Sequence, residues 1–155
     1  MERILLFGGG NQLHYTIDII NKEGKYDVIG IIDSIHPVGS DRFGYKVLGR
    51  QDDLIDIIDE FDIDGGLITI GDNWSRFYVR QSITKQLPNF KFINAIHPSV
   101  IIGENVNIGF GVVIGFNTVI GSGSLVTKSF PNNVLAYGSP AKVMKNRKQG
   151  EKFLK

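Results

Sequence analysis

An aliphatic residue returns at every sixth position between Ile96 and Val126, and a glycine usually follows it. This period fits neither an α-helix nor the alternation of a simple strand. Hexapeptide repetition is typical of a β-helix, in which each short strand stacks on its equivalent in the next coil. The pattern therefore predicts a β-helix, with repeated positions at Ile96, Ile102, Ile108, Ile114, Ile120 and Val126.

A second repeated position in each hexad also indicates side chains that point into a closed coil. Four residues after each repeated aliphatic position, small or β-branched side chains occur, which fit a narrow interior: Val100, Val106, Val112, Thr118 and Ser124. Glycines are expected to permit the corners between strands, because they tolerate unusual backbone angles. These glycines are Gly103, Gly109, Gly115 and Gly121.

Residues 1–94 show a different pattern, in which short apolar runs alternate with helically spaced ones. The predicted strands are Ile4–Phe7, Tyr26–Asp33, Tyr45–Leu48, Leu67–Ile70 and Phe90–Ile93, and the predicted helices cover Leu13–Ile20, Leu54–Phe61 and residues 75–87. Alternating strands and helices predict a small parallel sheet with helices on its faces. We therefore expect an α/β domain over residues 1–94, a short β-helix with a terminal cap over 95–143, and a basic tail over 144–155.

Polar or glycine-rich turns follow three of the predicted strands, at Gly8–Gly10, Asp33–Ser34 and Gly71–Asn73. Open parallel sheets bind ligands at the carboxyl ends of their strands, so the three turns predict one shared crevice. The glycine turn and the helix after it are suited to a nucleotide pyrophosphate, although a plain tight turn has the same sequence.

Three side chains near these turns could contact a nucleotide. Asp33 could accept hydrogen bonds from a ribose or a base edge, and Asn73 and Arg76 could meet a base or a phosphate. The alternative is that these residues only solvate loops and that Asp72 caps the next helix.

Composition narrows the class of protein. The chain has 17 basic and 16 acidic side chains, so no global field attracts nucleic acid or an anionic membrane. It has no cysteine, which excludes disulfides, a thiolate nucleophile and Cys-ligated zinc, and we expect no metal. The sequence has no cysteine, no signal-peptide pattern and no long apolar run. We therefore expect a soluble cytoplasmic protein.

The hexads from Ile102 to Gly121, then Val126–Lys128 and Gly138–Lys142, resemble the hexapeptide-repeat acyltransferases. With the Phe7–Gly10 turn, Asp33, and Ile70–Asn73 followed by Arg76, nearly the whole chain looks like the sugar-nucleotide acetyltransferases that modify bacillosamine, perosamine or sialic acid precursors.

This resemblance implies a Rossmann-like N-terminal domain, a left-handed parallel β-helix and a homotrimer. It implies a nucleotide-sugar, of UDP type, bound in the N-terminal domain by Gly8, Gly10, Asp33, Ser34, Gly71, Asn73 and Arg76. It also implies acetyl-CoA as co-substrate, held near Gly138, Ser139 and Lys142. The alternative for that last segment is a turn that only caps the solenoid.

Members of this family use a histidine within the β-helix as general base. Here no histidine lies between Ile102 and Lys155, and the three in the chain are His14, His36 and His97. His97 opens the repeat, at the wrong end of the coils for that base, so we expect it to be structural. The catalytic residue is therefore unidentified.

The family's β-helix is also longer, so we interpret the chain as a shortened member that keeps about two coils. Three functions remain open at this stage. The chain is an acetyltransferase of impaired or lost activity, a non-catalytic nucleotide-sugar-binding protein whose β-helix stub forms the trimer, or a structural solenoid without a ligand.

Overall fold

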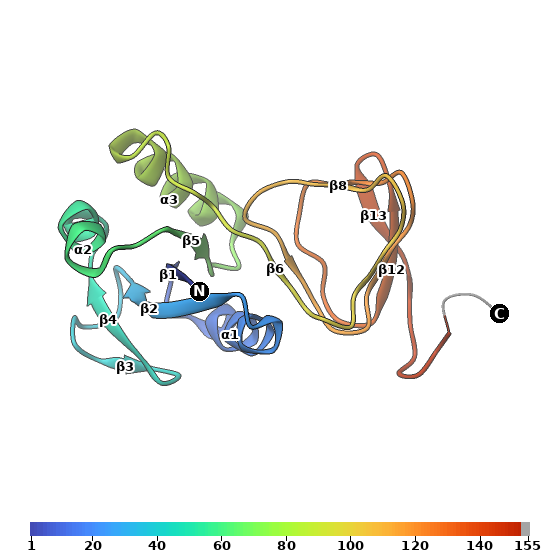
Figure 1. The fold of residues 1–155 in the computed structure, drawn as a ribbon, viewed down its shortest axis with the longest axis horizontal. Helices are drawn as coiled ribbons and strands as arrows, with labels where there is room; N and C mark the ends of the chain where they lie inside the picture. The colour runs from blue at the N-terminus through green and yellow to red at the C-terminus, as the bar shows by residue number, and fades with distance from the viewer. Residues whose placement is uncertain (153–155) are drawn as a thin grey trace. The chain divides into compact units, whose positions relative to one another are not determined.

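The computed structural model describes residues 1–152, which form two compact units divided between Ile93 and Asn94. The N-terminal unit is an α/β domain with a five-stranded sheet in the order β3-β4-β2-β1-β5 (Figure 1). Its strands are β1 (Glu2–Phe7), β2 (Tyr26–Ile32), β3 (Asp41–Arg42), β4 (Tyr45–Gly49) and β5 (Gly65–Ile68). Its helices are α1 (Asn11–Glu23), the 3-10 turn η1 (Gln51–Asp53), α2 (Leu54–Phe61) and α3 (Asn73–Gln86).

Helices cover both faces of this sheet (Figure 1). Leu5 and Phe7 of β1 pack in one core with Leu54 and Ile57 of α2 and with Ile83 of α3. Neighbouring residues of a strand point to opposite faces, so the other buried residues of β1 face the layer that α1 covers. The continuous apolar run of β1 follows from this burial on both sides.

Two details of this domain differ from the sequence-based expectation. The turn-rich segment before β4 contains the short strand β3, which pairs antiparallel with β4. Phe43 and Gly44, between these strands, both have positive φ. Such a tight turn depends on local backbone geometry, so the spacing of apolar residues does not predict it. The strand expected over Phe90–Ile93 is wrong, since only an isolated bridge between Gly66 and Phe92 forms there.

The C-terminal unit is a β-helix of two-residue strands, which confirms the hexad prediction. The strands are β6 (Ala95–Ile96), β7 (Ile101–Ile102), β8 (Asn107–Ile108), β9 (Val113–Ile114), β10 (Val119–Ile120) and β11 (Leu125–Val126). Ile101 pairs in parallel with Val119, and Asn107 with Leu125, each 18 residues further along the chain. One coil therefore consists of three hexads, and β6–β11 make two complete coils.

The predicted inward positions line the β-helix core. Ile114, Ile120 and Val126 of the second coil are fully buried, and Thr118 and Ser124 are buried with them. The first coil is less enclosed, and its Ile102 is 42% exposed. An end rung has a neighbouring coil on one side only, and this explains the weaker burial of the first coil.

The expectation that the four repeat glycines form the corners is wrong. Positive φ occurs two residues later instead, at Asn105, Gly111, Asn117 and Gly123. Asparagine tolerates this region better than other residues with a side chain. Gly103 has another role, since an added Cβ would lie 2.5 Å from the backbone nitrogen of Ser122 in the next coil. Gly103 therefore serves the close stacking of coils.

A hairpin closes the end of the β-helix. Strand β12 (Val134–Gly138) adds in parallel to β10, and β13 (Ala141–Asn146) folds back antiparallel on β12. The predicted basic tail therefore begins inside β13. Arg147 is buried, and its guanidinium donates to the carbonyl oxygens of Asn117 and Glu151. No helix within residues 1–152 has the length and apolar character needed to span a bilayer.

Candidate functional site

The three strand-end turns of the N-terminal unit meet at one edge of the sheet. The Gly9 amide, after β1, donates to Asp33 Oδ2, after β2, at 2.9 Å. Thr69, after β5, donates through its hydroxyl to the carbonyl oxygens of Phe7 and Gly8 at 3.0 and 2.7 Å. Residues that follow three of the strands therefore lie in contact at this edge, and the shared crevice itself stays a prediction.

Asp33 links the turns at this edge, because its carboxylate is hydrogen-bonded to groups of the protein itself. Its side chain is buried, and its carboxylate accepts from the amides of Gly9 and Ile35 and contacts His36 Nδ1 at 2.5 Å. Burial favours the neutral acid and is the largest influence on this group. The hydrogen bonds from Ile35, His36 and Gly9 together outweigh it, so the pKa of Asp33 lies below its ordinary value.

Gly9 must be glycine for this contact, since an added Cβ would overlap the carboxylate of Asp33. Gly8 is constrained differently. Its φ is 113°, and a Cβ added to it would lie 2.5 Å from Ile70 Cγ1. No atom lies within 4 Å of the Cβ position on Gly10. The sequence singled out Gly8 and Gly10, whereas the tightest approach to Asp33 is at Gly9.

Two arginines also reach this edge, and the sequence analysis missed them together with His36 and Thr69. Arg42 donates through Nε to the Gly9 carbonyl at 2.8 Å, and Arg50 donates through Nη1 to the Asp33 carbonyl at 3.1 Å. Arg42 comes from the hairpin strand β3, so it reaches the site only once that hairpin is known. Arg50, directly after β4, could have been found by extending the strand-end argument to a fourth strand.

The N-terminus of α1 opens onto the same turn. Gly10 precedes its first residue, no side chain caps the helix, and its first turn has no acidic residue. Unpaired amides and the helix dipole at such an end favour an anion. α3 differs, since Asp72 caps it by accepting from the Ser75 amide at 2.7 Å. This bond holds the pKa of Asp72 below its ordinary value.

The remaining predicted residues of this site lie around the β5–α3 turn or beside Asp33. Ser34 is exposed next to Asp33. Gly71 and Asn73 are exposed, and the virtual Cβ of Gly71 lies 3.4 Å from Gln12 Oε1 at the start of α1. Arg76 is half-buried in the second turn of α3. The fold thus brings Gly71 to the first turn of α1 and leaves Asn73 accessible.

The segment predicted to contact coenzyme is the turn between β12 and β13. Gly138 has φ of 114°, its amide donates to Ser124 Oγ at 3.2 Å, and the Ser139–Pro140 bond is cis. Ser139 and Lys142 are exposed. The turn therefore closes the coil stack while it leaves one hydroxyl and one ammonium in solvent.

The three histidines each contact another residue of their own unit. His14 lies against the Phe43 ring with centroids 5.0 Å apart, and His36 contacts Asp33. His97 is buried at the start of the β-helix, with Nδ1 2.8 Å from Ser99 Oγ. No three His, Asp or Glu side chains converge as metal ligands anywhere in residues 1–152.

Comparison with known proteins agrees with this architecture. The family model of the PglD N-terminal domain matches residues 3–87. No curated protein matches the chain. A variant of perosamine N-acetyltransferase from Caulobacter crescentus, solved with CoA and GDP-perosamine, aligns with a TM-score of 0.63 and 20% identity, covering 94% of this chain and 98% of that one. The acetyltransferase domain of PglB from Neisseria gonorrhoeae, solved with acetyl coenzyme A, aligns with a TM-score of 0.57 and 14% identity over 92% and 99%.

These alignments show that the fold is shared, and the match to the family model covers more than half of the sequence. The chain combines a Rossmann-like parallel sheet with a left-handed parallel β-helix. It belongs to the PglD N-terminal domain family.

Proposed function

We propose that this protein binds a nucleotide-sugar at the carboxyl edge of its N-terminal sheet and descends from enzymes that acetylate such sugars from acetyl-CoA. The observation that carries the proposal is the junction of the Gly9 amide, Asp33 and Thr69 beside the uncapped start of α1. A nucleotide pyrophosphate fits that helix N-terminus because its negative charge meets unpaired amides. Arg42 and Arg50 add two guanidinium groups to the same edge.

The acetyl donor would lie at the β-helix. The solved PglB domain contains acetyl coenzyme A and the perosamine enzyme contains CoA, and both share the fold. In this chain the exposed Ser139 and Lys142 of the β12–β13 turn are the proposed contacts, with lysine meeting phosphate as a point charge. We further propose a homotrimer formed through the β-helix and a cytoplasmic location.

The proposed acetyl transfer is impaired or absent. The β-helix contains two complete coils, and no histidine follows Ile102 in the sequence. Loss of a general base typically lowers a rate by about a hundred- to ten-thousand-fold. His97 is a poor replacement, because it is buried at the first rung and its Nδ1 contacts Ser99. On this proposal, the chain is a shortened member of the family that lacks the coils carrying the base.

The same observation favours a second candidate, a non-catalytic nucleotide-sugar-binding protein whose β-helix stub forms the trimer. Calorimetric titration with UDP, UDP-sugars and acetyl-CoA, followed by mass spectrometry of candidate amino-sugars, separates the two. Binding of both ligands with slow acetylation supports the impaired enzyme. Binding of UDP or a UDP-sugar alone, without product, supports the binding protein. If no nucleotide binds, the proposed site is wrong.

A further inference from the structure

Helix α3 leaves three aromatic side chains uncovered. Trp74, Phe77 and Tyr78 are 70%, 52% and 61% exposed, and their ring centroids lie 5.6 to 6.4 Å apart. In contrast, Ile83 is the one buried residue of this 14-residue helix. Each large aromatic side chain covers about 150–250 Å² when buried, so the three expose on the order of 300 Å², the size of patches that mark contacts on monomers.

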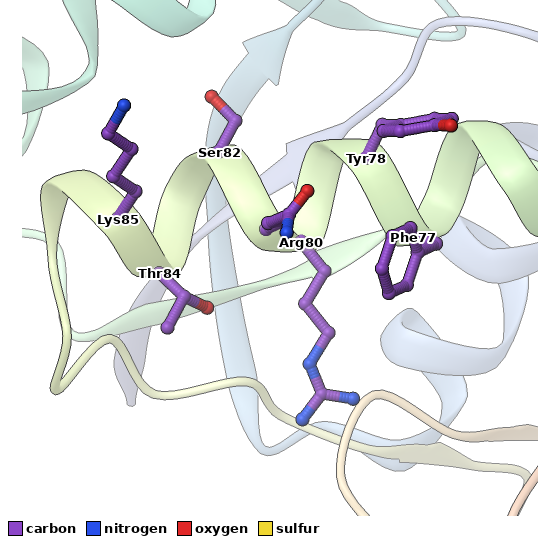
Figure 2. Close-up of a pocket in the computed structure, with 7 residues that line it drawn as sticks. Phe77, Tyr78, Arg80, Ser82, Thr84 and Lys85 are labelled. Atoms are coloured by element: carbon purple, nitrogen blue, oxygen red, sulfur yellow. The ribbon is translucent and has the colours of Figure 1, made fainter.

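Basic and polar side chains continue this aromatic surface along the helix. Figure 2 shows Tyr78, Ser82 and Lys85 on one side of α3 and Phe77, Arg80 and Thr84 on the other, around an open hollow that these residues line. The helix has three basic residues and no acidic one. Arg80 is also stacked over the Phe92 ring at 5.4 Å, which holds its stem in place. The outward face of α3 is therefore aromatic and cationic.

The opposite character occurs on α2 of the same unit. Residues 51–64 contain seven acidic side chains and no basic one. Asp56, Asp59 and Glu60 are exposed on α2, and among them Ile55 is 46% exposed. A single copy of the chain therefore carries an aromatic and cationic helix face as well as an acidic face with an apolar centre.

We propose that the α3 face of one copy docks on the α2 face of a second copy. The aromatic cluster would cover Ile55, while Arg80 and Lys85 meet Asp56 and Asp59. Charge complementarity of this kind fixes orientation and disfavours self-pairing of like-charged faces. Two copies can pair reciprocally, with each α3 on the other copy's α2, or head to tail, which closes into a ring or continues as a chain of copies. The proposal does not depend on the proposed acetyl transfer.

Trp74 provides a direct readout, because it is the one tryptophan of the chain. Raising the protein concentration is expected to shift its fluorescence to the blue, and added salt should reverse the shift by screening exposed charges. Lys85→Glu is expected to raise the half-maximal concentration about three- to tenfold, and Asp59→Lys in the same chain should restore it. Lys46→Glu, an exposed charge change on β4, is the matched control.

Crosslinking tests which faces meet, since the sequence has no cysteine of its own. A mixture of Gln81→Cys and Ile55→Cys variants should form a dimer with a short thiol-reactive crosslinker, and Gln81→Cys alone should not. Crosslinking of Gln81→Cys to itself would show a symmetric contact between α3 helices and overturn the proposal. So would the absence of crosslinks, or a Trp74 fluorescence that does not change with protein concentration.

Discussion

Asp33 shows how one buried side chain can hold together the turns at the carboxyl edge of a sheet. The sequence suggested a ribose contact, but the structure gives its carboxylate to Gly9, Ile35 and His36. Its position after β2 was predictable from the apolar run. Its partners were not, because they depend on how closely the β1 and β2 turns approach in space.

Replacing Asp33 should therefore act on stability before it acts on binding. Asp33→Ala leaves the buried Gly9 amide and the partly buried Ile35 amide without their acceptor, and an unsatisfied buried donor costs about 1–3 kcal/mol. We expect the free energy of unfolding, measured by urea titration, to fall by about 3 kcal/mol. Asp18→Ala, which removes an exposed acid paired with Lys22, should change it by less than about 1 kcal/mol. Equal losses in both variants would contradict the role assigned to Asp33.

The lowered pKa of Asp33 also predicts a pH dependence. Folding lowers this pKa, so the carboxylate contributes its full stabilisation at pH values above the pKa of Asp33 in the unfolded chain, about 4. The contribution is lost as the pH falls through the lower pKa of the folded state. The difference in unfolding free energy between wild type and Asp33→Asn should therefore be larger at pH 7 than at pH 3. A difference that grows on acidification would refute this sign.

At the scale of elements, the start of α1 allows stability and binding to be separated. Gly10→Asp supplies a preferred N-cap residue where no atom obstructs a Cβ, so the melting temperature should be unchanged or higher. The same negative charge should repel a pyrophosphate, and UDP affinity measured by calorimetry should fall at least about tenfold. Gln51→Asp, which adds equal charge at η1, should leave UDP binding unchanged. Undiminished UDP affinity in Gly10→Asp would place the phosphate elsewhere.

Coil stacking gives a second prediction for an element. Gly103→Ala places a methyl group against the backbone nitrogen of Ser122, and backbone of the next coil cannot move aside as a side chain would. We expect a loss of about 1–3 kcal/mol in unfolding free energy. Glu104→Ala, at the exposed adjacent position, should cost far less. A neutral Gly103→Ala would show that the coils tolerate wider spacing there.

The elements also show where sequence reasoning succeeded and where it failed. Hexads and apolar runs predicted β1, α1 and the β-helix rungs, because each period reflects the burial of one face. The hairpin that contains β3 was missed, since two-residue strands and positive-φ turns have no period. For the same reason the corners were assigned to the repeat glycines, whereas Asn105 and Asn117 adopt the positive φ. Because β3 was not predicted, the contact of its Arg42 with the Gly9 carbonyl was not predicted either.

At the scale of the whole molecule, the 18-residue coil predicts how the chain can be lengthened. An insert of 18 residues between Phe110 and Gly111, at an exposed corner, returns every later strand to the same face and the same inward pattern. Because each rung contacts only its neighbours, added rungs contribute nearly additively, and the melting temperature should be retained or raised. An insert of 9 residues shifts later strands by half a coil and should lower the melting temperature strongly.

The same insert tests the interpretation of lost catalysis. An 18-residue coil that carries a histidine at an outward position is expected to increase acetylation of a nucleotide-linked amino-sugar, measured by mass spectrometry, by about a hundredfold or more over the same coil with alanine there. The alanine version is the control, because it has the same length, register and stability. If both inserts fold and neither accelerates acetylation, loss of the β-helix histidine is not what limits this chain.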